Sequence, residues 1–340
     1  MKVLVTGHHG YIGSITAPFL TAAGHEVTGL DTFFYRGCDL VPGTDLPALA
    51  LDVRDVTPDH LRGFDAVVHL AALSNDPLGN VDPALTYEIN FHATVSIAKA
   101  AREAGVRRFV FASSCSMYGA GDDDRVTEDA PLKPLTPYAE SKVRSEEALT
   151  ALADGDFSPV AMRNATAYGA SPRLRLDIVL NNLVGWAFTT GFVTILSDGT
   201  PWRPVVHVED IARATAAILE APDEAVRGQA FNIGADEENY QVRDLAEMAR
   251  EAVPGSTVVY GGASDPDPRS YRVDFSKVRR ALPELSMRWR ARSGADELHA
   301  AYRAAGMTHE DFEGARFTRL KRLRELLDDN SVAPDLRWRT

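Results

Sequence analysis

The chain opens with an apolar strand, a glycine-rich turn and a helix, and this order constrains its fold more than any other feature. Residues 2–6 read as the strand and residues 12–23 as the helix. Glycines between them let the backbone approach a pyrophosphate at the helix N-terminus, where N–H groups and the helix dipole favour an anion. Glycines also occur in ordinary turns, but this position between strand and helix favours dinucleotide binding. The expected cofactor contacts are Gly7, Gly10, Tyr11, Ile12 and Gly13.

Short β-branched runs keep alternating with helical patterns through the first half of the chain. Further strands are expected at residues 26–30, 66–70, 108–113 and 160–163, and helices near residues 83–104 and 138–153. Such alternation implies right-handed crossovers and a parallel sheet that helices cover on both faces. We therefore expect an α/β fold with a Rossmann-type, doubly wound parallel sheet.

The length of the chain predicts a second lobe. A chain of 340 residues exceeds the usual size of a single hydrophobic core. The pattern becomes irregular after residue 163, although a strand–helix unit returns at residues 205–219 and a strand at 229–233. We expect residues 1–163 and 203–233 to bind the cofactor. Residues 164–202 and 234–340 should form a smaller interleaved α/β substrate lobe.

The C-terminal part of that lobe contains a basic amphipathic helix at residues 316–324. Such a helix is usually a solvated face that packs on its own domain. A partner-binding surface is the alternative that the sequence leaves open.

Charge and cysteine content exclude several classes of protein. A formal net charge of −12 argues against nucleic-acid or anionic-membrane partners. Cys38 and Cys115 show no CxxC spacing, so we expect neither a disulfide framework nor a metal site. The first residues enter a strand at once, and no apolar run of about 20 residues follows. These features predict a cytoplasmic protein.

Two carboxylates lie between the strands expected at residues 26–30 and 66–70. Asp31 lies roughly 20 residues beyond the glycines, where a carboxylate accepts hydrogen bonds from the adenosine ribose and repels a 2′-phosphate. This position predicts NAD rather than NADP. Asp52 and Val53 are expected beside the adenine, although an aspartate at a strand end is as often a helix cap.

A serine, a tyrosine and a lysine form the expected catalytic group. Tyr138 and Lys142 are four residues apart, and so lie on one helix face. Ser113 and Ser114 lie at the end of the strand expected at residues 108–113, at the sheet edge where ligands of such folds bind. A nearby ammonium group favours the phenolate form of a tyrosine, whose pKa is otherwise near 10. Ser114 would share a hydrogen bond with the reacting hydroxyl group.

These motifs, in this order, resemble the extended short-chain dehydrogenase/reductase family of nucleotide-sugar epimerases and dehydratases. The shared elements are T-G-x-x-G-x-x-G at residues 6–13, a serine before Y-G at 118–119, and Y-x-x-x-K at 138–142, within about residues 1–300. The resemblance implies catalysis by Ser114, Tyr138 and Lys142. It further implies cofactor contacts by Leu70, Ala71, Ala72, Asn90 and Ser113.

The same resemblance implies residues that hold the substrate. Asn182 would meet the substrate diphosphate, and Arg203 and Arg269 would clamp the nucleotide, with Arg272 as a competitor for the last role. An arginine suits this task because its planar donors engage phosphate oxygens in parallel. A surface salt bridge is the alternative for Arg203. Ser114 and Ser116 are expected beside the sugar.

Three departures from the family pattern bear on the reaction. Cys115 and Ser116 stand where 4,6-dehydratases carry an acid and a base, and Thr166 replaces a substrate-contacting asparagine. We therefore expect an NAD-dependent epimerase of a nucleotide-diphosphate sugar, acting at C4 in carbohydrate biosynthesis, as a homodimer. A dehydratase, decarboxylase or dehydrogenase of the same fold is the first alternative. A non-enzymatic NAD(H)-sensing protein is the second.

Overall fold

A computed structural model of the chain describes residues 1–74, 82–260 and 269–339. Its centre is a seven-stranded sheet in the order β11-β7-β5-β4-β1-β2-β3, and every neighbouring pair is parallel. The strands are β1 (Lys2–Thr6), β2 (Glu26–Asp31), β3 (Ala48–Ala50), β4 (Ala66–His69), β5 (Arg108–Ser114), β7 (Ser158–Asn164) and β11 (Ala230–Ile233). The expected α/β, Rossmann-type fold is confirmed.

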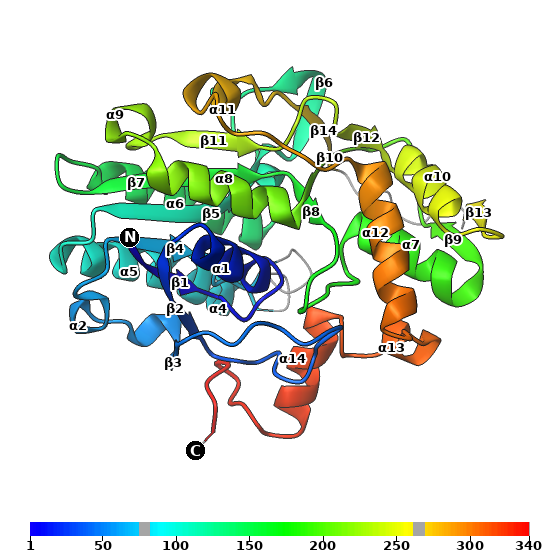
Figure 1. Ribbon diagram of the computed structural model, residues 1–340, viewed down its shortest axis with the longest axis horizontal. Helices are drawn as coiled ribbons and strands as arrows, with labels where there is room; N and C mark the ends of the chain where they lie inside the picture. Colours follow the sequence, from blue (N-terminus) through cyan, green and yellow to red (C-terminus); the bar gives the residue numbers. More distant parts are fainter. Residues whose placement is uncertain (75–81, 261–268, 340) are drawn as a thin grey trace.

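Helices cover both faces of this sheet (Figure 1). Alternate residues of β1 point to opposite faces, so Val3 and Val5 pack with one set of helices and Leu4 with the other. On the first face lie α1 (Gly13–Ala22), α8 (Val208–Glu220), α9 (Asp223–Val226) and α11 (Ser276–Ala281). On the second lie α2 (Pro58–Leu61), α4 (Pro83–Tyr87), the π-helix η2 (Glu88–His92), α5 (Ala93–Glu103) and α6 (Pro137–Leu152). Two short 3₁₀ turns, η1 (Val53–Asp55) and η3 (Cys115–Tyr118), follow β3 and β5.

The second lobe has its own small sheets and its own core. Strand β10 (Trp202–His207) pairs with β8 (Thr166–Tyr168) and β12 (Asn239–Gln241), and β9 (Phe192–Ile195) pairs with β13 (Thr257–Tyr260). The helices that pack on them are α7 (Val179–Thr190), α10 (Val242–Ala252), α12 (Ala291–Ala304) and α13 (His309–Glu313). A further parallel pair, β6 (Ala120–Val126) with β14 (Ser270–Val273), connects the two parts of the molecule.

Two elements depart from the expected division of the chain. Strand β10 belongs to the lobe sheet, whereas α8, which follows it directly, packs on the central sheet. Helix α14 (Arg319–Asp328) leaves the lobe and packs on the cofactor side, beside β2 and β3 (Figure 1). Its Leu323 and Leu326 join Leu30 and Val53 in one buried cluster, because the edge of the central sheet offers them apolar surface.

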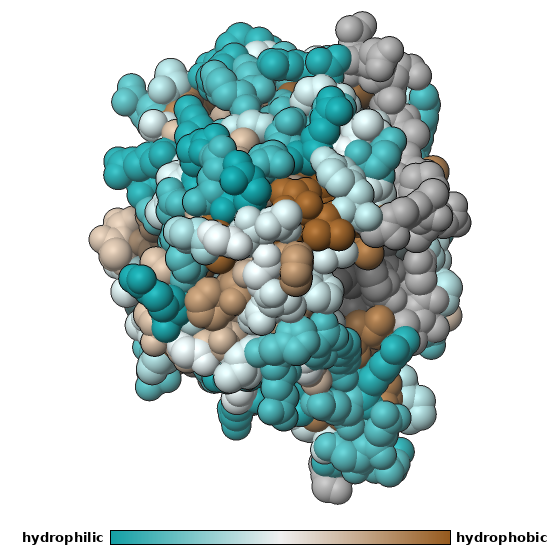
Figure 2. Space-filling model, turned by 90° about the vertical axis from the view of Figure 1, so that its right-hand side faces the viewer, coloured by the Kyte–Doolittle hydropathy of each residue, from teal (hydrophilic) through white to brown (hydrophobic). Residues whose placement is uncertain are grey.

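The lobe end of the molecule is mainly hydrophilic, with hydrophobic side chains reaching the surface near the middle of the view (Figure 2). The large hydrophobic residues exposed on β9, β13 and the adjoining turn are Phe192, Leu196, Val259 and Tyr260. No helix among the described residues is both long and apolar enough to cross a membrane.

Candidate active site

A cavity lies at the carboxyl edge of the central sheet, where the glycine-rich turn follows β1. We call it the glycine-loop cavity. The expected cofactor residues that line it are Gly7, Gly10, Tyr11, Ile12, Gly13, Asp31, Asp52, Val53, Leu70, Ala71 and Ala72. They come from the end of β2 and from the segments that follow β1, β3 and β4, so one edge of the sheet brings together residues up to 65 positions apart in the chain.

The backbone packs so closely around Gly7 and Gly13 that neither position has room for a side chain. A Cβ atom added to Gly13 would lie 2.2 Å from the carbonyl oxygen of Gly7, and one added to Gly7 would lie 2.7 Å from the backbone nitrogen of Ala71. Gly7 also has a φ of +71°, which side-chain-bearing residues rarely adopt. The turn therefore leaves an open backbone surface at the N-terminus of α1, which fits a pyrophosphate.

Asp31 and Asp52, the expected contacts of the ribose and the adenine, both line the glycine-loop cavity. The Asp31 carboxylate accepts hydrogen bonds from the backbone N–H groups of Phe33, at 2.7 Å, and His9, at 3.0 Å. Burial raises the pKa of Asp31, and these two donors oppose the shift. Asp52 lines the cavity and also caps η1, accepting from the backbone N–H and guanidinium of Arg54. The two roles considered for Asp52 are thus compatible.

The expected catalytic residues line a second cavity of about 680 Å³, which we call the Ser–Tyr–Lys cavity. Tyr11, Ile12, Leu70 and Ala72 line both cavities, so the two adjoin. The expected catalytic, cofactor and substrate residues in its wall are Ser113, Ser114, Ser116, Tyr138, Lys142, Asn182, Arg203 and Arg269. Residues of β5, α6, α7 and β10 therefore meet at one place.

Local structure fixes the tyrosine and the lysine on α6. The Thr136 hydroxyl accepts a hydrogen bond from the backbone N–H of Ala139 and caps the helix, and Pro137 occupies its first turn. The Lys142 ammonium lies 5.7 Å from the centre of the Tyr138 ring and donates to the Ala112 carbonyl oxygen at 2.7 Å. The lysine thus connects α6 to the end of β5.

Lys142 is a buried charge. Burial lowers its pKa to about 7, and Glu146, one helical turn further along α6, opposes this shift. A lysine whose pKa lies near 7 can exchange a proton near physiological pH. Its protonated form supplies positive charge to the phenol.

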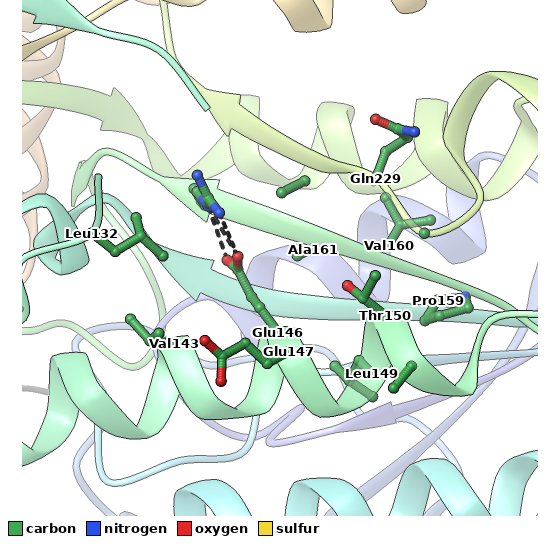
Figure 3. A pocket seen from close by; sticks show the side chains of 14 residues that line it. Leu132, Val143, Glu146, Glu147, Leu149, Thr150, Pro159, Val160, Ala161 and Gln229 are labelled. Atoms are coloured by element: carbon green, nitrogen blue, oxygen red, sulfur yellow. Dashed lines mark hydrogen bonds and ion pairs between the residues drawn. The ribbon is translucent and has the colours of Figure 1, made fainter. Parts of the chain in front are cut away.

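An ion pair behind Lys142 holds α6 against the sheet. Glu146 points from α6 to the guanidinium of Arg163 on β7, with both oxygens engaged at 2.7–3.1 Å (Figure 3). Arg163 also donates to the Tyr118 hydroxyl at 3.0 Å, and that hydroxyl donates to Asn232 at 2.7 Å. These bonds join η3, the turn directly after Ser114, to β7 and β11.

The serines at the end of β5 differ in their surroundings. The Ser114 hydroxyl faces the Ser–Tyr–Lys cavity and donates to the Ser116 hydroxyl at 3.0 Å. Cys115 is fully buried, and its thiol donates to the Arg163 carbonyl oxygen. Burial raises the pKa of this thiol well above its usual range.

Arg203 and Arg269 approach one another in the wall of the Ser–Tyr–Lys cavity, where the Arg203 guanidinium donates to the Arg269 carbonyl oxygen. Arg272, the competing candidate, instead packs over the Trp202 ring at 5.2 Å and does not line the cavity. Asn182 lines the cavity and donates to the Leu176 carbonyl oxygen.

Asn90 does not line either cavity, contrary to its expected cofactor contact. Its amide is buried and exchanges two hydrogen bonds with the backbone of Leu73, at 2.8 and 3.0 Å. Asn90 therefore supports the cofactor-lining segment after β4 from behind. His69 is likewise a core residue, bonded to the hydroxyls of Thr6 and Thr94.

Three charged residues that line the cavities were not predicted from the sequence. Arg175 forms a two-pronged ion pair with Asp177, and both side chains are largely buried. The run R-L-R-L-D at residues 173–177, just before a helix in an apolar region, is the signal that could have indicated them. Arg319, from α14, lines the glycine-loop cavity and had no such signal.

Comparison with known proteins assigns the family. The sequence pattern of the NAD dependent epimerase/dehydratase family matches residues 3–234. The chain belongs to this family. This epimerase/dehydratase is 33% identical to a UDP-glucose 4-epimerase of Corynebacterium glutamicum, over 74% of its length and 80% of the relative. It is 30% identical to one of Bacillus subtilis strain 168, over 88% and 95% of the two chains.

Solved structures agree with this assignment. MoeE5 in complex with UDP-glucuronic acid and NAD matches 90% of this epimerase/dehydratase and all of that chain, with a TM-score of 0.77 at 31% identity. DesIV, a dTDP-glucose 4,6-dehydratase of Streptomyces venezuelae with NAD bound, matches 92% of this chain and all of its own, with a TM-score of 0.78 at 26% identity. NAD is the cofactor, and the glycine turn fits it.

The position of Asp31 predicts cofactor selectivity. Asp31→Asn keeps an acceptor for the Phe33 N–H but removes the charge that repels a 2′-phosphate. We expect the preference for NAD over NADP to narrow by about tenfold, or roughly 1.4 kcal/mol. Titration of both cofactors measures it. An unchanged ratio would show that Asp31 does not read the ribose.

The phenol of Tyr138 predicts a selective loss of turnover. Tyr138→Phe removes the proton acceptor and should lower kcat by about 100- to 10,000-fold, with NAD affinity retained. Tyr87→Phe is the matched control, because the Tyr87 hydroxyl donates to Glu140 and the residue lies outside the described lining of both cavities. Steady-state kinetics and NAD titration check both variants. Near-normal turnover of Tyr138→Phe would contradict the assignment.

Proposed function

We propose that the chain is an NAD-dependent epimerase that inverts C4 of a nucleotide-diphosphate sugar through a transient 4-keto intermediate. The observation that carries the proposal is one cavity with Ser114, Tyr138 and Lys142 in its wall and no free carboxylic acid beside them among the described lining residues. A dehydratase needs a further acid and base to remove water, whereas direct epimerization at C4 needs no acid or base besides Tyr138.

The residues at the two dehydratase positions support this choice. Cys115 is buried behind the cavity wall with its thiol on the Arg163 carbonyl oxygen, so it is not placed to donate a proton to a sugar. Ser116 has a hydroxyl that is already engaged with Ser114. Asp177 is the carboxylate found among the described lining residues, and Arg175 holds both of its oxygens.

The chain's own residues account for the proton transfers. In its phenolate form, Tyr138 accepts the proton of the sugar's 4-hydroxyl group as that oxygen becomes a ketone, and Ser114 hydrogen-bonds the same oxygen. Lys142 stabilises the phenolate by its charge. Bound NAD supplies a reversible hydride acceptor for C4. The 4-keto sugar then rotates in the cavity, and C4 takes the hydride back on its other face. Tyr138 returns the proton to the oxygen, and C4 has the opposite configuration.

The substrate half of the proposal depends on the arginines. Arg203, Arg269 and the Asn182 amide lie together in the cavity wall and offer donors to a diphosphate. Two UDP-glucose 4-epimerases are 30% and 33% identical in sequence to this chain over most of its length, and MoeE5 binds UDP-glucuronic acid. We therefore assign a UDP-sugar as the substrate class. We further propose that the protein works in the cytoplasm as a homodimer.

Turnover in heavy water tests the reaction class. Purified protein and NAD are incubated with UDP-glucose, UDP-glucuronic acid and dTDP-glucose, and the products are followed by mass spectrometry and NMR. We expect a 4-epimer of unchanged mass, no solvent deuterium on carbon and no accumulation of NADH. Loss of water with deuterium at C5 would identify a dehydratase. Stoichiometric NADH would identify a dehydrogenase, and loss of CO2 from UDP-glucuronic acid would identify a decarboxylase. Failure on all three sugars would contradict the substrate class.

A further inference from the structure

The C-terminal segment, residues 319–339, returns from the lobe to the glycine-loop cavity. Helix α14 and the turn after it bury their apolar side chains against the edge of the central sheet, beside the strands that end at the cavity (Figure 1). The buried residues of the segment in this cluster are Leu323, Leu326, Val332 and Leu336. A bridge between Val332 and Trp338 folds the last residues back on themselves.

Polar contacts fasten the segment to the two strand ends that carry Asp31 and Asp52. The Trp338 indole N–H donates to the carbonyl oxygen of Thr32, which lines the cavity. The Arg337 guanidinium pairs with Asp55, at 2.5 Å. Arg54, which also holds Asp52, donates to the backbone oxygen of Asp335 at 2.9 Å. Movement of the segment is thereby linked to the residues around the adenosine end of the cavity.

Arg319 is the residue of this segment that reaches the cavity. Its side chain is 2% exposed, and its guanidinium packs over the Tyr35 ring at 4.0 Å. Nη2 donates to the Arg173 carbonyl oxygen at 2.8 Å. Nη1 is buried and has no hydrogen-bond partner. Leaving a buried charged donor without a partner is unfavourable, so this atom is placed to gain from a ligand.

The charges in the cavity wall are otherwise paired. Among the described lining residues, Asp52 pairs with Arg54, Arg175 pairs with Asp177, and Asp31 accepts two backbone hydrogen bonds. Arg319 has no ion pair within 4 Å in the described part of the chain. A dinucleotide brings a pyrophosphate with two negative charges into this space. The unpaired guanidinium has the complementary charge and donor geometry.

The glycine turn cannot supply that charge itself. It offers backbone N–H groups, and the pKa of its His9 is lowered to about 3 by burial and by the nearby Arg173, so this imidazole is neutral at pH 7. Any full positive charge beside the pyrophosphate therefore comes from another part of the chain. Arg319 is the lining cation without a carboxylate partner among the residues described.

We propose that Arg319 binds the cofactor, with Nη1 donating to the pyrophosphate of the bound dinucleotide and the C-terminal segment closing the cavity behind it. This inference rests on NAD as the cofactor and is independent of the sugar and of the reaction. The basic helix expected from the sequence thus serves its own active site rather than a separate partner protein.

Cofactor affinity of full-length variants tests the proposal. Arg319→Gln keeps a polar side chain of similar length without the charge, and Arg324→Gln removes the same charge from an exposed position on the same helix. Nucleotide-free protein is titrated with NAD and ADP by calorimetry, and with adenosine by ligand-observed NMR. For Arg319→Gln we expect NAD and ADP to bind about 10- to 100-fold more weakly, as for loss of one hydrogen bond to a charged group, and adenosine to bind unchanged. Arg324→Gln should match the unaltered protein.

Unchanged binding of NAD and ADP by Arg319→Gln would overturn the proposal, and so would an equal loss for adenosine, which has no phosphate. A second measurement on the unaltered protein remains decisive if this variant does not fold. The backbone N–H groups of Val332 and Ala333 bond to Leu326 and Arg337 within the segment. NAD should slow their hydrogen exchange. Protection of the glycine turn without protection of these groups would contradict closure by the segment.

Discussion

The close approach of α1 to the end of β1 is the constraint on which the rest of the site depends. No side chain can stand at Gly13 without meeting the carbonyl oxygen of Gly7, and none at Gly7 without meeting the backbone of Ala71. The backbone is therefore bare where a pyrophosphate must come close. Because all strands of the central sheet are parallel, the same edge also presents Asp31 and Ser114. One steric requirement thus sets the place for the cofactor and for the catalytic residues.

Burial of the Lys142 ammonium group, which the catalytic arrangement requires, lowers the stability of the fold near neutral pH. An unfolded lysine holds its proton up to a pH of about 10.5, whereas burial lowers the folded pKa to about 7. Between these values the unfolded chain binds more protons, so this group makes the fold more stable as pH rises from about 7 to about 10.5. Near neutral pH the group therefore opposes folding. The Glu146–Arg163 ion pair and the bond to Ala112 hold the helix in place despite that cost.

The sequence predicted the central architecture because its signals are local. Strand β1 has the expected bounds, and β2, β4, β5, β7 and β11 begin and end within two residues of expectation, since each is a short apolar run between turn residues. Strand β3 was not expected, because its three residues are too short a run to be recognised. The glycine turn and the Tyr138–Lys142 spacing likewise carry their geometry within a few residues. Asn90 shows the limit: the family pattern indicated its importance, but only the packed structure shows that it bonds Leu73 rather than lining the cavity.

Long-range packing could not be read from the sequence. Strand β10 and helix α8 are consecutive in the chain yet belong to different parts of the molecule, because β10 finds its partners in β8 and β12. Arg319 is about 290 residues from Asp31, and a basic helix by itself does not show which surface it will cover. Arg175 and Asp177 are buried together only because the lobe closes over them.

The central claim is a reversible oxidation at C4 inside one cavity, with proton transfer through Tyr138. The most direct measurement follows a deuterium atom placed on C4 of UDP-glucose during turnover by the purified protein with NAD. The account predicts that deuterium stays on C4 in both the remaining substrate and the 4-epimer, with none in solvent. Deuterium at any other carbon, in solvent or in released NADH would contradict it.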